Sequence, residues 1–427
     1  MTCSSLTISL FSLFLFSFSL SIANAQVPLN ETFQRINEGE FGPYIHEYYP
    51  DYRTVRFGGL FVLCFYNTTP NAYTLGIRMG RRRAEPFYRW VWEANRGNPV
   101  GENATITFGV DGNLVLAHTD GRVAWQTNTA NKGVVGIRML PNGNMVLIDS
   151  KGNFAWQSFD SPTDTLLVGQ SLRADGINKL VSRLSVEENK DGPYSYVLEP
   201  KGLSLYYKSK NSGKSLLYFS TTQMAPIRET LKNWTLEVNP DNADVNSSEI
   251  TFGFFLVRPK YNSTLTFLRL GIDGNIKFYT YNDKVDYRPF EVTFTLFDRE
   301  SDWESECQLP ARCETFGVCE DNQCVACPSP KGLQGWNESC EAEKVKSCRP
   351  SDFHYYKIEG VDHFLSKFTS GSALKEGDCE KKCTSDCKCL GYFYNQQSSR
   401  CWVASDLMTL TKVANSTHLG YIKTPNN

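Results

Sequence analysis

Cysteine is nearly absent from the larger, N-terminal part of the chain. Only Cys3 and Cys64 precede residue 300, whereas twelve of the fourteen cysteines lie between Cys307 and Cys401. An apolar core must therefore hold the N-terminal part together. Disulfides must hold the C-terminal part together. Cys64 is left as an odd thiol. We expect it to be a small buried side chain in a strand, with pairing to a second molecule as the alternative.

The chain also lacks an excess of either charge. Its 44 basic and 46 acidic residues give a net charge of −2, which argues against a nucleic-acid partner. Arginines do gather in one stretch: Arg78, Arg81, Arg82, Arg83, Arg89 and Arg96. We interpret this stretch as a solvated turn between two strands, and a site for an anionic polysaccharide or a membrane surface is the alternative.

Catalytic motifs are missing as well. Gly-x-Ser-x-Gly and His-Glu-x-x-His do not occur, and Ser212-Gly-Lys-Ser215 lacks the upstream glycine of a phosphate-binding loop. The five histidines have no metal-ligand spacing: His46, His118, His354, His363 and His418. Carboxylates are plentiful, so a glycosidase pair stays open, but no pattern points to one. We expect a protein that is not an enzyme and uses no metal and no cofactor.

Long apolar runs are confined to the N-terminus. Residues 1–25 are rich in Leu, Phe and Ser and end in Ala23-Asn24-Ala25, which predicts a secretory signal peptide cleaved after Ala25. A retained signal anchor is the alternative. No later run approaches the ~18 apolar residues of a membrane span. We therefore expect a secreted, extracellular protein.

Sequons for N-glycosylation agree with secretion. Asn-x-Ser or Asn-x-Thr occurs eight times, at Asn30, Asn67, Asn103, Asn233, Asn246, Asn262, Asn337 and Asn415. This density predicts surface positions that carry glycans.

The chain contains a short sequence pattern that occurs three times. Gly-Asn-Leu-Val-Leu at 112–116 leads to Ala-Trp-Gln at 124–126, and Gly-Asn-Met-Val-Leu at 143–147 leads to Ala-Trp-Gln at 155–157. With the earlier Val-Trp-Glu, tryptophans fall at positions 92, 125 and 156, which are 33 and 31 residues apart. Each copy is typical of a β-hairpin, which cannot bury its apolar face alone. Three hairpins around an axis can point their tryptophans at one another, so we predict an all-β, pseudo-threefold β-prism.

These residues also carry a family resemblance. Trp-Glu-Ala-Asn-Arg at 92–96, Asp-Gly-Asn-Leu-Val-Leu at 111–116 and Trp-Gln-Ser-Phe-Asp-Ser-Pro-Thr-Asp-Thr-Leu-Leu at 156–167 resemble the bulb-type, mannose-binding lectin domain of plants. The version in S-locus-type glycoproteins and secreted epidermal glycoproteins is the most similar. The resemblance implies an N-terminal segment at 26–45, a lectin domain at 46–167 and a second, diverged lectin-like domain at 168–301. For the second domain a β-sandwich is the alternative.

The cysteine-rich part resembles two small modules of the same family. Residues 302–343 are similar to an EGF-like segment, and 348–424 to a PAN (apple-like) domain. Cys324-Val-Ala-Cys327 has redox or zinc spacing, but no second ligand pair accompanies it, so structural disulfides are favoured. The PAN resemblance implies pairs Cys379–Cys401 and Cys383–Cys389, and it leaves Cys348 and Cys387 for each other. Cys379 and Cys383 lie one helical turn apart and should face one side of a short helix.

The family binds mannose through Gln-x-Asp-x-Asn-x-Val-x-Tyr. The first copy has Gly109, Asp111, Asn113, Val115 and Ala117 in those positions; the second has Leu140, Asn142, Asn144, Val146 and Ile148; a third, in the second domain, has Gly271, Asp273, Asn275, Lys277 and Tyr279. The residues that match are the candidate carbohydrate ligands: Asp111, Asn113, Val115, Asn144, Val146, Asp273, Asn275 and Tyr279.

Every copy departs from this pattern. A hydrogen bond contributes about 0.5–1.5 kcal/mol, and a single-sugar site near millimolar affinity has only about 4 kcal/mol in total. The alternative for Asp-Gly-Asn is turn formation, because these residues adopt the positive φ of tight hairpins. We therefore expect a lectin-like glycoprotein of the cell wall or apoplast with a degenerate mannose site. Its partners would be glycans of the wall or of glycoproteins, mannose-containing ones among them. The alternative is a module for secreted or cell-surface proteins, with the PAN domain as the contact.

Overall fold

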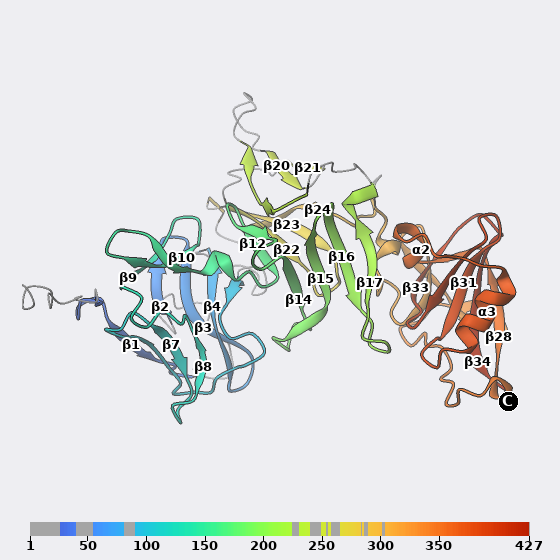
Figure 1. The fold of residues 1–427 in the computed structure, drawn as a ribbon, viewed down its shortest axis with the longest axis horizontal. Helices are drawn as coiled ribbons and strands as arrows, with labels where there is room; N and C mark the ends of the chain where they lie inside the picture. Colours follow the sequence, from blue (N-terminus) through green and yellow to red (C-terminus); the bar gives the residue numbers. More distant parts are fainter. Residues whose placement is uncertain are drawn as a thin grey trace, which may run out of the picture.

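The computed structural model describes residues 26–39, 54–80, 90–223, 230–239, 249–252, 255–257, 265–282, 284–285, 289–300 and 304–426. The predicted signal peptide and the sequons at Asn246 and Asn262 lie outside these residues. Three bodies follow one another along the long axis in chain order, coloured blue to teal, green to yellow, and orange to red (Figure 1). Within the described residues, no helix is both long and apolar enough to cross a membrane.

The first body is a β-prism made of three antiparallel sheets. The first sheet contains β2 (Thr54–Gly58), β3 (Phe61–Thr69), β4 (Ala72–Met79) and β5 (Trp90–Glu93). The second contains β1 (Phe33–Ile36), β6 (Thr105–Phe108), β7 (Leu114–Ala117) and β8 (Val123–Gln126). The third contains β9 (Val134–Met139), β10 (Met145–Asp149) and β11 (Phe154–Gln157). One copy of the repeated pattern lies in each sheet, as the sequence predicts.

The three tryptophans meet at the centre of this prism. Ring centroids are 5.7 Å apart for Trp92 and Trp125, 5.9 Å for Trp92 and Trp156, and 5.7 Å for Trp125 and Trp156. All three pairs are edge-to-face, a favourable arrangement of aromatic quadrupoles. The near-equal distances confirm the pseudo-threefold arrangement that the repeat spacing predicts.

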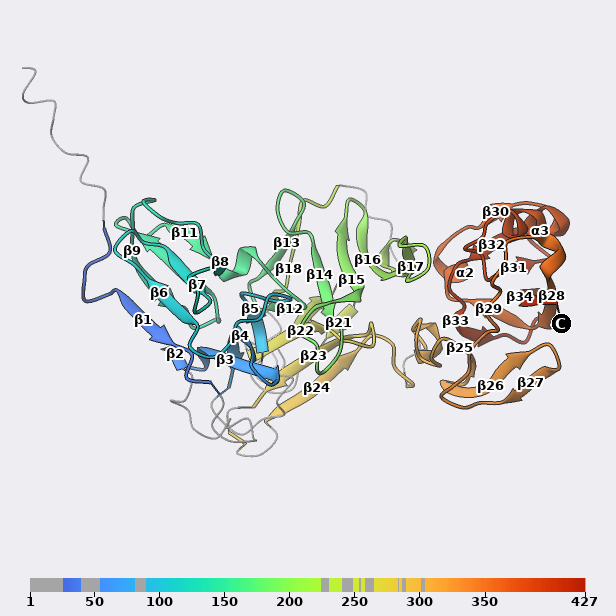
Figure 2. The same cartoon turned by 90° about the horizontal axis from the view of Figure 1, so that it is seen from below.

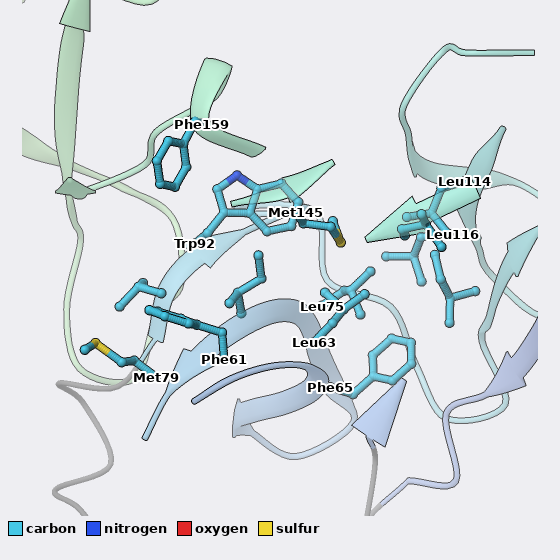
Figure 3. Close-up of a cluster of buried hydrophobic side chains, with 14 of the residues drawn as sticks. Phe61, Leu63, Phe65, Leu75, Met79, Trp92, Leu114, Leu116, Met145 and Phe159 are labelled. Atoms are coloured by element: carbon cyan, nitrogen blue, oxygen red, sulfur yellow. The ribbon is translucent and has the colours of Figure 1, made fainter. Parts of the chain in front are cut away.

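Aliphatic and aromatic side chains from all three sheets surround this centre. Phe61, Leu75, Leu116 and Met145 are among the buried residues drawn in Figure 3. Trp92, which is 3% exposed, lies among them and donates its indole N–H to the Ser161 carbonyl at 3.0 Å.

The N-terminal segment belongs to this prism, which differs from the expected boundary at residue 46. β1 pairs with β6, and the rings of Phe33 and Phe108 are 6.0 Å apart. Val27 is 3% exposed and donates its backbone N–H to Val110. The segment covers an edge of the sheet and contributes to the core, so it is not a separate lead-in.

The second body is also built from antiparallel sheets. One contains β14 (Lys179–Arg183), β15 (Asp191–Glu199), β16 (Gly202–Lys208) and β17 (Ser215–Ser220). Another contains β12 (Thr165–Leu167), β22 (Thr266–Leu270), β23 (Ile276–Tyr281) and β24 (Phe290–Thr295). Two smaller sheets pair β13 (Ser171–Arg173) with β18 (Asn233–Thr235), and β19 (Val238–Asn239) with β20 (Glu249–Phe252) and β21 (Phe255–Val257). Tandem β-prisms therefore make up the N-terminal part of the molecule.

One sheet is shared between the two prisms. Phe267 and Tyr279 of β22 and β23 pack into the first core, whereas Leu268 and Phe278 of the same strands pack into the second. β12 also pairs with β22, although the expected boundary placed residue 167 in the first domain. The two prisms thus have no clean boundary, because both faces of this sheet are buried.

The third body has two sheets, and one of them joins strands of both cysteine-rich modules. One contains β27 (Gly332–Gly335), β26 (Gln323–Ser329), β25 (Phe316–Glu320), β33 (Met408–Lys412) and β29 (Val361–His363). The other contains β28 (Phe353–Glu359), β34 (His418–Pro425), β31 (Gly391–Asn395), β32 (Arg400–Ala404) and β30 (Ser372–Ala373). The helices are α2 (Leu365–Phe368) and α3 (Glu376–Thr384), and Figure 2 shows them from a second side. The short segment at 302–343, expected to depend on disulfides alone, gains a core because β25 pairs in parallel with β33.

Six disulfides lie in this body: Cys307–Cys319, Cys313–Cys324, Cys327–Cys340, Cys348–Cys387, Cys379–Cys401 and Cys383–Cys389. The last three are the pairs that the resemblance implies. Cys379 and Cys383 are both fully buried on one side of α3, as the one-turn spacing predicts. Cys64 takes part in none of these disulfides and is 4% exposed in β3, so it is inaccessible to a second molecule in the folded chain.

The sequons differ in accessibility. Asn30, Asn103, Asn233 and Asn337 are exposed, and Asn415 is half-buried. Asn67 is only 5% exposed, and its amide donates to the Thr69 carbonyl at 3.1 Å. The structure therefore favours glycans at the exposed positions over Asn67, and occupancy remains a prediction.

A buried histidine lies where the second and third bodies meet. His363 is 1% exposed; its Nε2 is 2.9 Å from the Asp406 carbonyl, and its Nδ1 accepts the Leu365 N–H at 3.2 Å. This pattern requires the neutral ring with its proton on Nε2. Burial lowers the pKa of His363 to about 4, although its backbone hydrogen bonds act in the opposite direction.

Replacing Trp92 with Ala should cost about 3–5 kcal/mol of unfolding free energy, because it empties the centre of the first prism. Denaturant unfolding followed by fluorescence would measure the loss. Trp336→Ala, at a tryptophan that is 37% exposed, is the matched control and should change stability by about 0.5 kcal/mol or less. Equal losses in the two variants would contradict a central role for the triad.

The stability of the fold should fall in acid because of His363. An unfolded histidine titrates near 6.5 and the folded one near 4, so the unfolded chain takes the proton first. The contribution is complete above pH ~6.5 and is lost as the pH falls toward ~4, by about 3 kcal/mol at most. Unfolding at both ends of this range should show a smaller acid loss for His363→Gln, whose amide can still donate to Asp406. An unchanged loss would assign the acid sensitivity to other groups.

Candidate functional site

The candidate sugar-binding residues lie in three turns of the same construction. The side-chain oxygen at the motif's acidic position accepts the backbone N–H two residues later: Asp111 from Asn113 at 3.0 Å, Asn142 from Asn144 at 3.2 Å and Asp273 from Asn275 at 3.0 Å. The glycine between them has a φ of +80°, +87° and +79° at Gly112, Gly143 and Gly274. These are turn-forming roles, which is the alternative that the sequence leaves open.

The motif asparagines are buried, and the fold itself uses their amides. Asn113 donates Nδ2 to Gln126 at 2.9 Å, and its Oδ1 accepts from Thr127 Oγ1 at 3.0 Å and from the Thr129 N–H at 3.1 Å. Asn144 repeats this with Gln157 at 2.8 Å. Exposure of the two side chains is 7% and 4%. Their hydrogen-bonding groups therefore hold neighbouring strands together and do not point to a ligand.

Asn275 has the same role in the second prism. It donates Nδ2 to the Phe297 carbonyl at 2.9 Å and accepts the Phe297 N–H at 3.1 Å, and it is 3% exposed. Asp273 is exposed but forms an ion pair with Lys277 at 3.1 Å. Both groups are occupied within the chain.

The remaining candidates differ in their exposure. Val146 is completely buried, and Tyr279 is 6% exposed and stacks on Phe267 with centroids 5.3 Å apart. Val115 is half-buried in β7. Each turn brings its own Asp or Asn pair together, and in the first two copies Ala117 and Ile148 stand at the tyrosine position of the family pattern.

The sequence analysis missed the partners of these asparagines. Gln126 and Gln157 follow the repeated tryptophans, and Thr127 and Ser158 come directly after them. The hydroxyl oxygens of Thr127 and Ser158 accept the backbone N–H of the residue that follows each motif asparagine. Thr127 accepts from Leu114 at 3.1 Å, and Ser158 accepts from Met145 at 2.9 Å. The recurrence of Trp-Gln followed by a hydroxyl residue is the signal that could have identified them.

A buried ionic network lies at the Trp-Glu-Ala-Asn-Arg motif of residues 92–96. Arg96 donates to Glu93 at 2.9 Å, to Asp164 at 2.7 Å and to the Val181 carbonyl at 2.7 Å. Its side chain is 8% exposed. The prediction of a solvated basic turn is therefore wrong for Arg96, because the nearby Glu93 and the distant Asp164 bury its charge. Arg81, Arg82, Arg83 and Arg89 lie outside the described residues.

Further groups complete the network. Arg183 contacts both Glu93 and the Tyr66 hydroxyl, and Arg269 donates to Thr165 Oγ1 at 3.0 Å. Burial, and next the charge of Glu93, raises the pKa of Tyr66 well above its ordinary value, so the phenol keeps its proton and donates it to Glu93.

Charge balance within the network favours ionised carboxylates. Burial alone would raise the pKa of Asp164, but the guanidinium groups of Arg96, Arg269 and Arg183 outweigh it and hold the pKa below its usual range. Asp164 adjoins β12, and Arg183 and Arg269 lie in β14 and β22. The network therefore ties the first prism to the second.

Known proteins resemble this chain in sequence. The family of D-mannose binding lectins matches residues 89–186, which include the Trp-Glu-Ala-Asn-Arg motif. EP1-like glycoprotein 3 of Arabidopsis thaliana is 52% identical over 425 residues, 96% of each chain. The epidermis-specific secreted glycoprotein EP1 of Daucus carota is 55% identical over 368 residues, 80% of this chain and 94% of the carrot protein. The chain belongs to the EP1-like glycoprotein family.

Solved lectins are more distant from this EP1-like chain. A monomeric mannose-binding lectin from Gastrodia elata is 21% identical and covers 24% of this chain and 82% of its own, with a TM-score of 0.17. The strand order and the tryptophan triad, rather than this superposition, define the prism. Among the described residues, no group of three or more His, Cys, Asp and Glu side chains could hold a metal ion.

Asp164→Asn in this EP1-like chain should cost about 3–5 kcal/mol, because it leaves buried guanidinium charge uncompensated while keeping the side-chain size. Urea unfolding of the full chain measures the loss. Asp175→Asn is the control, since Asp175 pairs with Arg173 at an exposed position and its loss should change stability little. If Asp164→Asn is as stable as this control, the network does not hold the prisms together.

Proposed function

We propose that this EP1-like chain is a secreted, non-catalytic, lectin-like glycoprotein of the plant cell wall and apoplast, acting in recognition or cell-surface signalling. Its ligands would be glycans of the wall or of glycoproteins. The carrot relative, named a secreted glycoprotein, supports this proposal, as do the predicted signal peptide and the exposed sequons.

One observation carries the view that the mannose motifs are degenerate. The amides of Asn113, Asn144 and Asn275 all bond to the chain itself, and all three side chains are buried. A sugar would have to replace two or more of these hydrogen bonds without a net gain, since protein and ligand bonds are of similar strength. In this proposal the motifs serve the prism as scaffold, and recognition takes place elsewhere on the surface.

A protein partner is the second candidate function. The hairpin of β26 and β27, with the residue that follows it, has three exposed apolar side chains: Val325, Leu333 and Trp336, at 39%, 48% and 37%. β27 is also the edge strand of its sheet, with one row of backbone groups unpaired by another strand of that sheet. This hairpin lies in the proposed EGF-like segment, which shares its sheet with the proposed PAN domain.

Calorimetry with mannose and mannose-rich oligosaccharides tests the scaffold role. The affinity, if measurable, should be the same in the wild type and in Asp111→Ala, because Asp111 only caps a turn. Asp120→Ala is the matched control: Asp120 accepts the Arg122 N–H at 3.0 Å in a turn outside the motif. A loss of saturable binding in Asp111→Ala but not in Asp120→Ala would show that the first copy still binds mannose.

A further inference from the structure

A cavity lies within the C-terminal body, away from the three lectin turns. Its volume is about 360 Å³, toward the lower end of the ~300–1,000 Å³ typical of small-molecule sites. Strands of both C-terminal sheets and the short helix α2 line it. Its chemistry depends on five side chains: Asp362, Lys367, Asn395, Trp402 and His418.

Three of these side chains form a fixed chain of hydrogen bonds. Asp362 Oδ1 is 2.7 Å from His418 Nδ1, and His418 Nε2 is 2.7 Å from Asn395 Nδ2. Asn395 Oδ1 accepts the Ser398 N–H at 2.9 Å, so its NH₂ group must face the histidine. His418 Nε2 is then an acceptor, which makes the ring neutral with its proton directed at Asp362.

This set of hydrogen bonds leaves a donor and an acceptor available to a ligand. Asp362 Oδ2 has no hydrogen bond to any described residue, and Asn395 Nδ2 keeps a second hydrogen. Burial raises the pKa of Asp362 and His418 partly offsets this, so a ligand that donates to the carboxylate would restore lost solvation. The Asp362 and His418 side chains are 27% and 21% exposed, so solvent reaches both.

The lining has no excess charge. Lys367, 44% exposed, gives one of its three N–H groups to Glu304 at 2.7 Å and keeps two. Among the lining residues Lys367 is the one cation and Asp362 the one carboxylate, and the Lys367 charge is already paired with Glu304, while His418 and His363 are neutral. Such a surface offers no net attraction to a phosphate, a sulfate or a uronic acid, and it suits an uncharged ligand with many hydroxyl groups.

Trp402 adds a rigid aromatic wall. Its indole N–H donates to the Thr369 carbonyl at 3.2 Å and to the Thr369 hydroxyl at 3.0 Å. Gly371 lies against the same ring: a Cβ atom at this position would be 2.7 Å from it, so a larger residue would displace the indole. The ring is therefore held in place before any ligand arrives, and its apolar surface can pack on the C–H face of a sugar ring.

We propose that this cavity binds a neutral saccharide of about one or two sugar rings. Asp362 and Asn395 would bond its hydroxyls, Lys367 would donate to its oxygens and Trp402 would pack on a ring. The proposal deepens the proposed function, because it places glycan recognition in the C-terminal body instead of in the lectin turns.

The test is calorimetry of the full secreted chain against glucose, galactose, mannose, xylose and arabinose, cellobiose and mannobiose, with galacturonic acid as the charged probe. Asp362→Asn keeps the bond from His418 but replaces the accepting Oδ2 with a donor. Trp402→Ala removes the wall. Asp378→Asn is the control, since Asp378 is half-exposed on α3, pairs with Lys381 and lies outside the cavity. Near-ultraviolet circular dichroism would verify the fold of each variant.

We expect saturable binding of at least one neutral sugar, weakened about tenfold or more in Asp362→Asn and in Trp402→Ala but not in Asp378→Asn. Binding that is unchanged in folded Asp362→Asn would overturn the proposed site and leave glycan recognition intact elsewhere. Preference for galacturonic acid would overturn the ligand class. If the wild type binds none of the probes, the site and the glycan function both fail, and the protein-partner candidate remains.

Discussion

The arrangement of the N-terminal body depends on buried charge between its two prisms. Arg96, Arg183 and Arg269 surround Glu93 and Asp164 in a region that water hardly reaches. Desolvating such groups is so costly that each carboxylate must keep its partners, and those partners come from both prisms. Removing one member of the network would therefore leave buried charge uncompensated. Any other relative placement of the prisms would leave buried charges without their partners, at a large cost in free energy.

The apolar packing reinforces the same placement. β22 and β23 present one set of side chains to each core, because successive residues of a strand, such as Phe278 and Tyr279, face opposite sides of the sheet. A sheet with both faces buried cannot be removed from either prism without exposing apolar surface. The sharing of this sheet also explains why Tyr279, a candidate ligand by its position in the motif, is a core residue of the first prism.

Features that rest on local period were predictable, and those that rest on distant pairing were not. The 33- and 31-residue spacings predicted the triad of Trp92, Trp125 and Trp156, and the one-turn spacing predicted the buried cysteines of α3. Nothing local identifies Asp164 as the partner of Arg96, 68 residues away. The motif asparagines show a subtler limit. An amide in a turn can bond to a sugar or to the next strand, and only the placement of Gln126 and Gln157 decides between the two.

The same physics indicates where recognition can occur in such a molecule. A repeat that closes a prism must satisfy its own polar groups, and the motif asparagines of the three turns are satisfied within the chain. Junctions between sheets are different, because side chains from several strands converge without a regular pairing partner. The cavity around Asp362 and Trp402 is such a place, and disulfides in the surrounding body limit its rearrangement. A ligand held by strands of both C-terminal sheets would stabilise their association by mass action, so that binding and the integrity of this body would be coupled.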